Sequence, residues 1–190
     1  MARNQVIDKD LGWKELLARV AELAGDAYTK VGLLGGDDAG GLHEPGSPLT
    51  TTEIGIVNEF GTADGRVPER SFLRACFDLK REELAAMAAK LLTGVIDGKL
   101  SVDKALNVLG AWFAAEVKKF ITEGPEIPPP NAESTRRRKE KAGAWNADGM
   151  AQQPPAAMGP RTLVESMTMV RSITWAVFTS RAARVIRGGS

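Results

Sequence analysis

The sequence has few of the side chains on which most enzyme and metal chemistry depends: its 190 residues include one cysteine, one histidine and one tyrosine. The lone cysteine, Cys76, excludes an intramolecular disulfide and a multi-cysteine zinc site. The lone histidine, His43, lies in a stretch rich in glycine and proline, and any Ser-His-Asp or Cys-His arrangement would have to use it. We therefore predict a non-enzymatic protein with no catalytic residue, no metal and no cofactor.

Long apolar runs are also missing from the sequence. Nothing approaches the ~18 uninterrupted apolar residues of a transmembrane helix, and the N-terminal segment alternates charged with apolar side chains, unlike a signal peptide. We therefore expect no membrane partner and a chain that is cytoplasmic when it is made. With 43% hydrophobic and 26% charged residues, the composition is that of a globular domain that can bury a core.

The net charge is small, +1, but the charges are unevenly distributed. Seven acids and one arginine lie between residues 37 and 69, whereas five arginines and one acid lie between 161 and 190. Segments of opposite charge can pair within one copy or head to tail between copies. The basic end of the chain therefore does not require nucleic acid as a partner.

Apolar periodicity and capping signals divide the chain into short and long elements. The pattern predicts helices over 11–25, 54–60, 72–97 and 102–123, a last helix beginning at 162, and strands over 28–34 and 172–179. Thr50 and Glu53 have the spacing of a capping box, and Gly61 is placed to end the short helix. Ser71, Ser101 and Thr162 are candidate caps of the later helices, and Gly98 is placed to end the first long helix. The connection 97–100 is short, so the two long helices should form an antiparallel hairpin.

These elements predict an α+β fold, in which a small antiparallel sheet packs with a long helical hairpin and with short N- and C-terminal helices. Residues 1–123 and 161–180 would form one domain, which is interrupted by a surface loop at 35–50. An extended proline-rich and basic arm at 124–160 and a basic tail at 181–190 complete the predicted organisation.

The predicted arm carries the clearest charged patch of the sequence, a basic run that begins at residue 136. Its candidate contact residues are Arg136, Arg137, Arg138, Lys139 and the nearby Trp145. Basic side chains beside an aromatic ring can bind a nucleic-acid backbone through charge and stacking. The near-neutral total charge favours a solvated linker or an arm that pairs with an acidic neighbour, so contact with DNA is possible but not required.

Three ordered segments carry a more specific signal. Residues 52–62 read Thr-Glu-Ile-Gly-Ile-Val-Asn-Glu-Phe-Gly-Thr, and residues 67–74 read Val-Pro-Glu-Arg-Ser-Phe-Leu-Arg. Residues 163–175 run from Leu-Val-Glu-Ser-Met to Ser-Ile-Thr-Trp. Together these segments resemble small tail-completion and neck proteins of long-tailed bacteriophages, although the third lacks the glycine expected there, so its turn should differ.

The resemblance implies an α+β protomer in a ring at the head–tail joint or at the upper end of the tail. The partners would be further copies of the chain and the neighbouring connector and tail proteins. The protein would be found in the host cytoplasm during assembly and then in the virion. The alternatives are another neck, tail-terminator or minor capsid role, and a nucleic-acid-binding module that uses the basic arm.

The resemblance also implies a structural hub that doubles as an interface. Its residues are Glu59, Phe60, Gly61, Pro68, Arg70, Phe72, Leu73, Arg74, Ser172 and Trp175. Within this set, Gly61 would permit the turn after the short helix. Phe60 and Phe72 would be buried, and the two arginines would pair with acids or bind partners.

Overall fold

The computed structural model describes residues 10–34, 48–142, 163, 167–178 and 186–187. Its helices are α1 (Trp13–Leu23), α2 (Thr51–Phe60), α3 (Phe72–Ile96), α4 (Val102–Glu123), α5 (Glu133–Ala142) and α6 (Thr168–Arg171). Its strands are β1 (Tyr28–Gly32), β2 (Thr174–Phe178) and β3 (Ile186–Arg187). The predicted α+β class is confirmed, because a small antiparallel sheet accompanies these helices.

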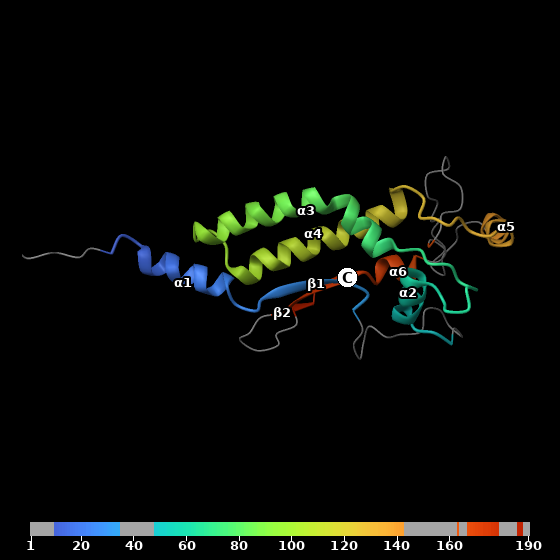
Figure 1. The fold of residues 1–190 in the computed structure, drawn as a ribbon, viewed down its shortest axis with the longest axis horizontal. Helices are drawn as coiled ribbons and strands as arrows, with labels where there is room; N and C mark the ends of the chain where they lie inside the picture. The colour runs from blue at the N-terminus through green and yellow to red at the C-terminus, as the bar shows by residue number, and fades with distance from the viewer. Residues whose placement is uncertain (1–9, 35–47, 143–162, 164–166, 179–185, 188–190) are drawn as a thin grey trace, which may run out of the picture.

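The long helices α3 and α4 form the predicted antiparallel hairpin, which is the body of the molecule (Figure 1). α3 ends at Ile96, and Gly98 follows with a φ of 73°, a conformation that glycine adopts without steric cost. The Ser101 hydroxyl then accepts a hydrogen bond from the Lys104 amide at 3.3 Å and so caps α4. α4 lies between α3 and the sheet, so it packs on two sides.

The sheet joins segments that are far apart in the sequence. Its strands are antiparallel and lie in the order β1-β2-β3. In the β1–β2 pair, Tyr28 lies opposite Phe178 and Gly32 lies opposite Thr174. Both predicted strands are therefore present, and their pairing brings the C-terminal part of the chain back beside the N-terminal part.

Gly110 lets α4 approach the sheet closely. A Cβ atom at this position would lie 2.5 Å from Oγ1 of Thr29 and 2.8 Å from Cδ1 of Trp175, distances that side chains do not reach. The Trp175 indole also donates a hydrogen bond from Nε1 to Oδ1 of Asn107 at 2.6 Å. Trp175 is half-buried, and an indole N–H that is shielded from water usually finds such a partner, so this bond helps to fix how β2 sits on α4.

The buried core has two parts, one at each end of the hairpin. The part near α2 and α6 contains Phe72, Cys76, Ala114, Val117, Phe120, Ile121, Ile127, Met169, Val170 and Ile173. The part near the hairpin turn contains Leu91, Val95, Val102 and Ala105. Phe72 is fully buried, as predicted. Burial raises the pKa of the Cys76 thiol to about 11, because a thiolate is poorly solvated there.

α1 is present as predicted, but it lies beside the body rather than in it. All of α1 is described, and none of its side chains is buried. The Arg19 guanidinium donates a hydrogen bond to the carbonyl of Ile96 at 3.1 Å, and Leu23 packs against the core near the hairpin turn. The rest of α1 projects beyond the end of the hairpin (Figure 1).

The C-terminal helix is shorter than the sequence suggests. A helix that begins at 162 is predicted, but α6 starts at Thr168, after Met167 with a left-handed φ of 62°. Leu163 also has a positive φ of 66°. Such residues interrupt a right-handed helix, so the prediction of one helix from 162 is wrong. Thr162, its predicted cap, lies outside the described residues.

Part of the predicted extended arm is a helix. α5 covers Glu133–Ala142, the segment that holds the basic run, and an ion pair between Arg137 and Glu133 spans one of its turns. This segment contains neither proline nor glycine and is rich in arginine, lysine and glutamate, which are good helix formers. The prolines that suggest an extended arm all lie outside it. In the predicted basic tail, Ile186–Arg187 pairs with β2 as β3.

Candidate functional site

The predicted hub begins with α2, whose two ends are fixed by local hydrogen bonds. The Thr50 hydroxyl accepts a hydrogen bond from the Glu53 amide at 3.2 Å, and the Glu53 carboxylate accepts one from the Thr50 amide at 2.8 Å. This is the predicted capping box. The Thr50 amide, together with its hydroxyl, lowers the pKa of the Glu53 carboxyl group. The helix therefore starts at a defined residue.

The other end of α2 needs a glycine. Gly61 has a φ of 73°, and its amide donates to the carbonyl of Val57 at 2.8 Å. A Cβ atom at this position would lie 2.9 Å from the backbone nitrogen of Glu69 and 3.0 Å from the carbonyl oxygen of Val67. Backbone atoms cannot move aside as side chains can. Gly61 therefore allows both the turn and the close return of the chain.

A compact loop connects α2 to α3. The Thr62 amide donates to the carbonyl of Val67 at 2.9 Å, and the Thr62 hydroxyl accepts from the Val67 amide at 3.0 Å. The same hydroxyl donates to Oδ1 of Asp64 at 2.7 Å. This bond, with the amide of Arg66, lowers the pKa of the Asp64 carboxyl group. The loop thus brings residues 67–71 back beside the C-terminal end of α2.

Glu59 is the centre of the hub, and its side chain is only 5% exposed. Oε2 accepts a hydrogen bond from the Leu73 amide at 2.9 Å. Oε1 accepts from the Arg74 amide at 3.2 Å and from the Ser71 hydroxyl at 3.0 Å. The carboxylate therefore occupies the N-terminus of α3, where free amides and the helix dipole favour a negative charge.

The capping role differs from the one that the sequence suggests for Ser71. The spacing predicts that the Ser71 hydroxyl caps α3, but the hydroxyl instead donates to Glu59, whose carboxylate reaches the amides. A carboxylate supplies two oxygens and a full charge, so it can serve Leu73 and Arg74 together. The buried charge is satisfied by these bonds, as a buried carboxylate must be.

Arg74 connects three parts of the hub. Its Nε donates to Glu59 Oε1 at 3.1 Å, and its terminal nitrogen donates to the carbonyl of Glu59 at 3.1 Å and to Glu69 Oε1 at 2.7 Å. The hydrogen bond to the Glu59 carboxylate is the main reason why the pKa of Arg74 is raised. The guanidinium also lies 5.1 Å from the ring centroid of Phe60, in cation–π geometry.

The predicted burial of Phe60 is wrong, since this residue is 64% exposed. The spacing of the apolar residues in α2 suggests a buried face that includes Phe60, but α2 packs through a different face, formed by Thr51, Gly55 and Glu59. Gly55 allows this packing, because a Cβ atom there would lie 1.9 Å from Cδ1 of Leu33. Small residues and one charge are therefore buried, and Phe60 points outward.

Arg70 attaches the hub to the segment that follows α4. Its amide donates to the carbonyl of Asn58 at 2.7 Å, and its Nε donates to the carbonyl of Pro129 at 3.1 Å. Burial lowers the pKa of Arg70. Pro68 is half-buried in the same return of the chain. The bonds of Arg70 therefore link three segments of the chain.

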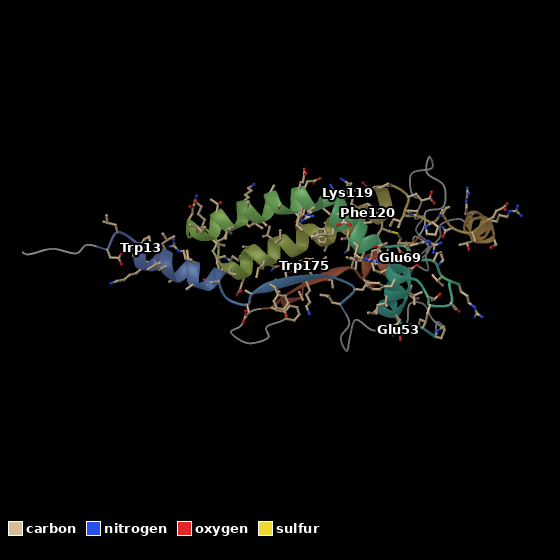
Figure 2. The ribbon with its side chains drawn as sticks, viewed as in Figure 1. Trp13, Glu53, Glu69, Lys119, Phe120 and Trp175 are labelled. Carbon is tan, nitrogen blue, oxygen red and sulfur yellow. The ribbon has the colours of Figure 1, made fainter. Side chains whose placement is uncertain are left out.

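The remaining predicted hub residues lie apart from Glu59. Ser172 follows α6 and donates from its hydroxyl to the carbonyl of Thr168 at 2.8 Å, and α6 contacts α2. Trp175 lies between α4 and the sheet, away from Glu53 and Glu69 at the α2 end (Figure 2). The predicted set therefore divides into one connected hub over residues 59–74 and a separate contact between β2 and α4.

The predicted arm residues are only partly described. Arg136 and Arg137 are exposed on α5. Arg138 and Lys139 belong to the same helix, but their side chains lie outside the described part of the chain, as does the whole of Trp145. The arm meets the hub at Pro129, whose carbonyl accepts the hydrogen bond of Arg70.

Two important residues, Asn107 and Gly110, are missing from the sequence prediction. Gly110 stands in the middle of a long helix, where glycine costs about 1 kcal/mol relative to alanine, and such a glycine often marks a close contact. The sequence therefore does contain a signal for Gly110. The partner of Asn107, by contrast, is Trp175, 68 residues away, and nothing local indicates it.

The arrangement defines an α+β protein with a hydrogen-bonded structural hub. Among the described residues, no group of three or more His, Cys, Asp or Glu side chains could hold a metal ion. Over the same residues, none of the helices has the length and apolar character needed to cross a membrane. Comparisons with protein families, curated proteins and solved structures find no match to this chain.

Proposed function

We propose that this chain is a non-catalytic structural protein of a long-tailed phage virion, which completes the tail or joins it to the head connector as an oligomeric ring. One observation carries the proposal: the two phage-like segments, residues 52–62 and 67–74, meet around the carboxylate of Glu59. The residues on which the resemblance rests are thus the ones that hold α2, the loop and α3 together. The protein would act through its shape.

The hydrogen bonding of Glu59 supports a structural role. A general acid or base must come within hydrogen-bond reach of a proton on its substrate. The oxygens of Glu59 already accept bonds from Ser71, Leu73 and Arg74, and the side chain is almost fully buried. Its geometry is that of a group that fixes the backbone.

Exposed apolar side chains support a protein that works in contact with others. Ile56 and Phe60 are exposed on α2, Leu79 is exposed on α3, and Trp13 and Leu17 are exposed on α1. Contiguous apolar surface on a folded chain marks sites of interaction, and among these residues Ile56 and Phe60 lie one helical turn apart on α2. These residues lie on helices whose positions are fixed or limited by the hub and the hairpin.

Native mass spectrometry and negative-stain imaging of the 190-residue chain test the proposal. Over a concentration series, we expect one closed oligomer whose fraction rises with protein concentration. In purified virions, the chain should be located between the head connector and the tail tube at residue resolution. A chain that stays monomeric at high concentration and is absent from phage particles would contradict the proposal.

A second function, nucleic-acid binding, is favoured by the folding of the basic run into α5, on which Arg136 and Arg137 are exposed. A basic helix can neutralise backbone phosphates, and binding then weakens steeply as salt rises. Filter binding of duplex DNA at several salt concentrations tests this function. Replacement of Arg136, Arg137 and Arg138 by alanine should abolish such binding, and the oligomer should remain. Salt-independent or undetectable binding would exclude the second function.

A further inference from the structure

The segment between α4 and α5 is anchored to the body of the molecule at two points. Ile127 is 5% exposed and belongs to the part of the core near α2 and α6. Two residues later, the carbonyl of Pro129 accepts a hydrogen bond from Nε of Arg70 at 3.1 Å. The amide of Arg70 in turn donates to the carbonyl of Asn58 in α2 at 2.7 Å. This part of the predicted arm is therefore fastened to the hub.

The second anchor lies close to the start of the basic helix. α5 begins at Glu133, four residues after Pro129, and lies at the α2 end of the molecule (Figure 1). Four residues span at most about 14 Å when they are fully extended. Pro130, within this connection, has a fixed φ and makes it stiffer. The contact of Arg70 with Pro129 thus limits where α5 can lie.

α5 is strongly basic, although the chain as a whole is nearly neutral. Its ten residues include five bases and two acids, a formal charge of +3, whereas the whole chain carries +1. One of the acids, Glu133, pairs with Arg137. Among the residues that the structure describes, neither Arg70 nor Arg136 has an acidic side chain within ion-pair distance. The fold therefore leaves positive charge on the helix and on its anchor, and this charge suits an anionic partner.

The basic positions are spread around α5 rather than gathered on one side. Arg136, Arg137, Arg138 and Lys139 are consecutive, and consecutive positions on an α-helix differ by about 100°, so these four encircle the axis. Contact with an acidic protein surface would use only one side of such a helix. The major groove of duplex DNA is about 12 Å wide and admits a helix between two rows of phosphates. It therefore fits a helix that is basic all round.

We propose that Arg70 is a positioning residue, which holds α5 at a defined place on the hub through the carbonyl of Pro129, and that α5 binds there in the major groove of duplex DNA. This inference rests on nucleic-acid binding, the second function proposed above, and names the groove and the residue that places the helix. A helix that is already positioned loses less freedom when it binds than a helix on a free linker, so it binds more tightly.

A distance measurement tests the positioning step without DNA. Spin labels can be attached through Ser134→Cys in α5 and Glu82→Cys in α3, both at exposed positions. The native Cys76 is fully buried and does not compete for the label. Pulsed electron resonance should give a narrow distribution of label distances. Arg70→Ala should widen it about twofold, because the connection before α5 is then free to move.

Arg66→Ala is the matched control, because it removes the same charge from the same loop. The Arg66 side chain is 87% exposed and pairs with Asp64 within the loop. Both variants should stay folded by circular dichroism, since the backbone bond of Arg70 to Asn58 does not need the side chain. Arg66→Ala should keep the distance distribution narrow. If Arg70→Ala keeps it equally narrow, Arg70 does not position α5 and the inference falls.

Binding of a short duplex DNA, followed by fluorescence anisotropy, tests the partner. If each of the five bases of α5 neutralises one phosphate, the logarithm of the binding constant should fall with the logarithm of salt concentration at a slope of about −4.5. Arg66→Ala and Arg70→Ala each remove one charge. Arg70→Ala should weaken binding about fivefold more, because it also releases the helix. Equal weakening in the two variants would overturn the positioning role and leave the second function standing.

Blocking one groove at a time tests where α5 binds. Duplex DNA that carries glucose on its major-groove cytosine atoms should not bind, whereas netropsin, which fills the minor groove, should not displace the protein. Displacement by netropsin would overturn the groove assignment. If the wild-type chain binds no duplex DNA even at low salt, the second function fails. A distance distribution that still depends on Arg70 would then indicate an acidic protein as the partner of α5, and the DNA part of the inference would be wrong.

Discussion

The two ends of the molecule are held by different kinds of interaction. At the α2 end, the buried carboxylate of Glu59 accepts hydrogen bonds from Ser71, Leu73 and Arg74, so helix, loop and helix share one charged centre. At the other end, α1 is attached through a hydrogen bond of Arg19 and the partial burial of Leu23, and none of its side chains is fully buried.

This difference separates a strongly fixed element, α2, from a weakly fixed one, α1. Leaving the amides of Leu73 and Arg74 without their buried acceptor would cost roughly 1–3 kcal/mol, so the position of α2 on α3 is strongly specified. Exposed polar contacts contribute roughly 0–1 kcal/mol, so α1 is weakly specified by its own copy. The position of α2 is therefore fixed by the hub, whereas that of α1 is only weakly fixed by its few contacts with the rest of the chain.

The largest effect expected within one copy comes from Glu59→Ala. The substitution leaves the amides of Leu73 and Arg74 without their capping acceptor, and we expect a loss of about 2–3 kcal/mol in the free energy of unfolding. Urea titration followed by circular dichroism measures it. Glu69→Ala is the control, because it removes only the exposed partner of Arg74 and should cost much less. Equal losses in the two variants would contradict the central role of Glu59.

A smaller effect is expected from Gly61→Ala, and a second glycine gives a matched control. Gly61 and Gly65 have φ values of 73° and 70°, so alanine is strained by a similar amount at both. At Gly61 alone, the added Cβ meets backbone atoms at 2.9 and 3.0 Å, whereas at Gly65 nothing lies within 4 Å. We expect roughly 1 kcal/mol of loss at Gly65 and about 1 kcal/mol more at Gly61. Thermal denaturation measures the loss of stability in each variant. Equal losses would show that the backbone of residues 67–69 does not pass close to Gly61.

The elements that sequence reasoning predicts well are those fixed by neighbours in the chain. Thr50 and Glu53 are three residues apart, and the capping box that they predict is present. Gly98 and Ser101 similarly mark the turn of the hairpin. In each case, the residues that signal the structure also make its hydrogen bonds, so the local pattern is sufficient.

Prediction fails where a contact between distant segments decides the outcome. The apolar spacing of α2 suggests that Phe60 is buried. However, the Glu59 carboxylate caps the start of α3, so α2 packs with Glu59 facing inward and Phe60 facing solvent. The left-handed residues Leu163 and Met167 likewise carry no signal in their own side chains. Each residue type has a preferred backbone conformation, and tertiary packing can impose a different one.

Trp175→Phe tests the contact between β2 and α4. This contact lies between the α1 end and the α2 end of the molecule. Phenylalanine keeps most of the apolar surface but removes the Nε1 hydrogen bond to Asn107. We expect a loss of about 1 kcal/mol in the free energy of unfolding, the usual net value of one hydrogen bond. Combining it with Asn107→Ala in a double-mutant cycle isolates the pair. Strictly additive losses would show that the bond contributes nothing.

The smallest effect is expected at Leu17 of α1, which is 47% exposed, and it sharpens the comparison most. Leu17→Asp, studied at low protein concentration, should change the free energy of unfolding by no more than roughly 0.5 kcal/mol, as for other surface substitutions. Leu23→Asp, in the same helix, should cost clearly more, because Leu23 packs against the core near the hairpin turn. Urea titration of both variants at low concentration measures the difference. If Leu17→Asp were as destabilising as Leu23→Asp, Leu17 would be packed against the rest of the chain, and the weak attachment of α1 would be contradicted.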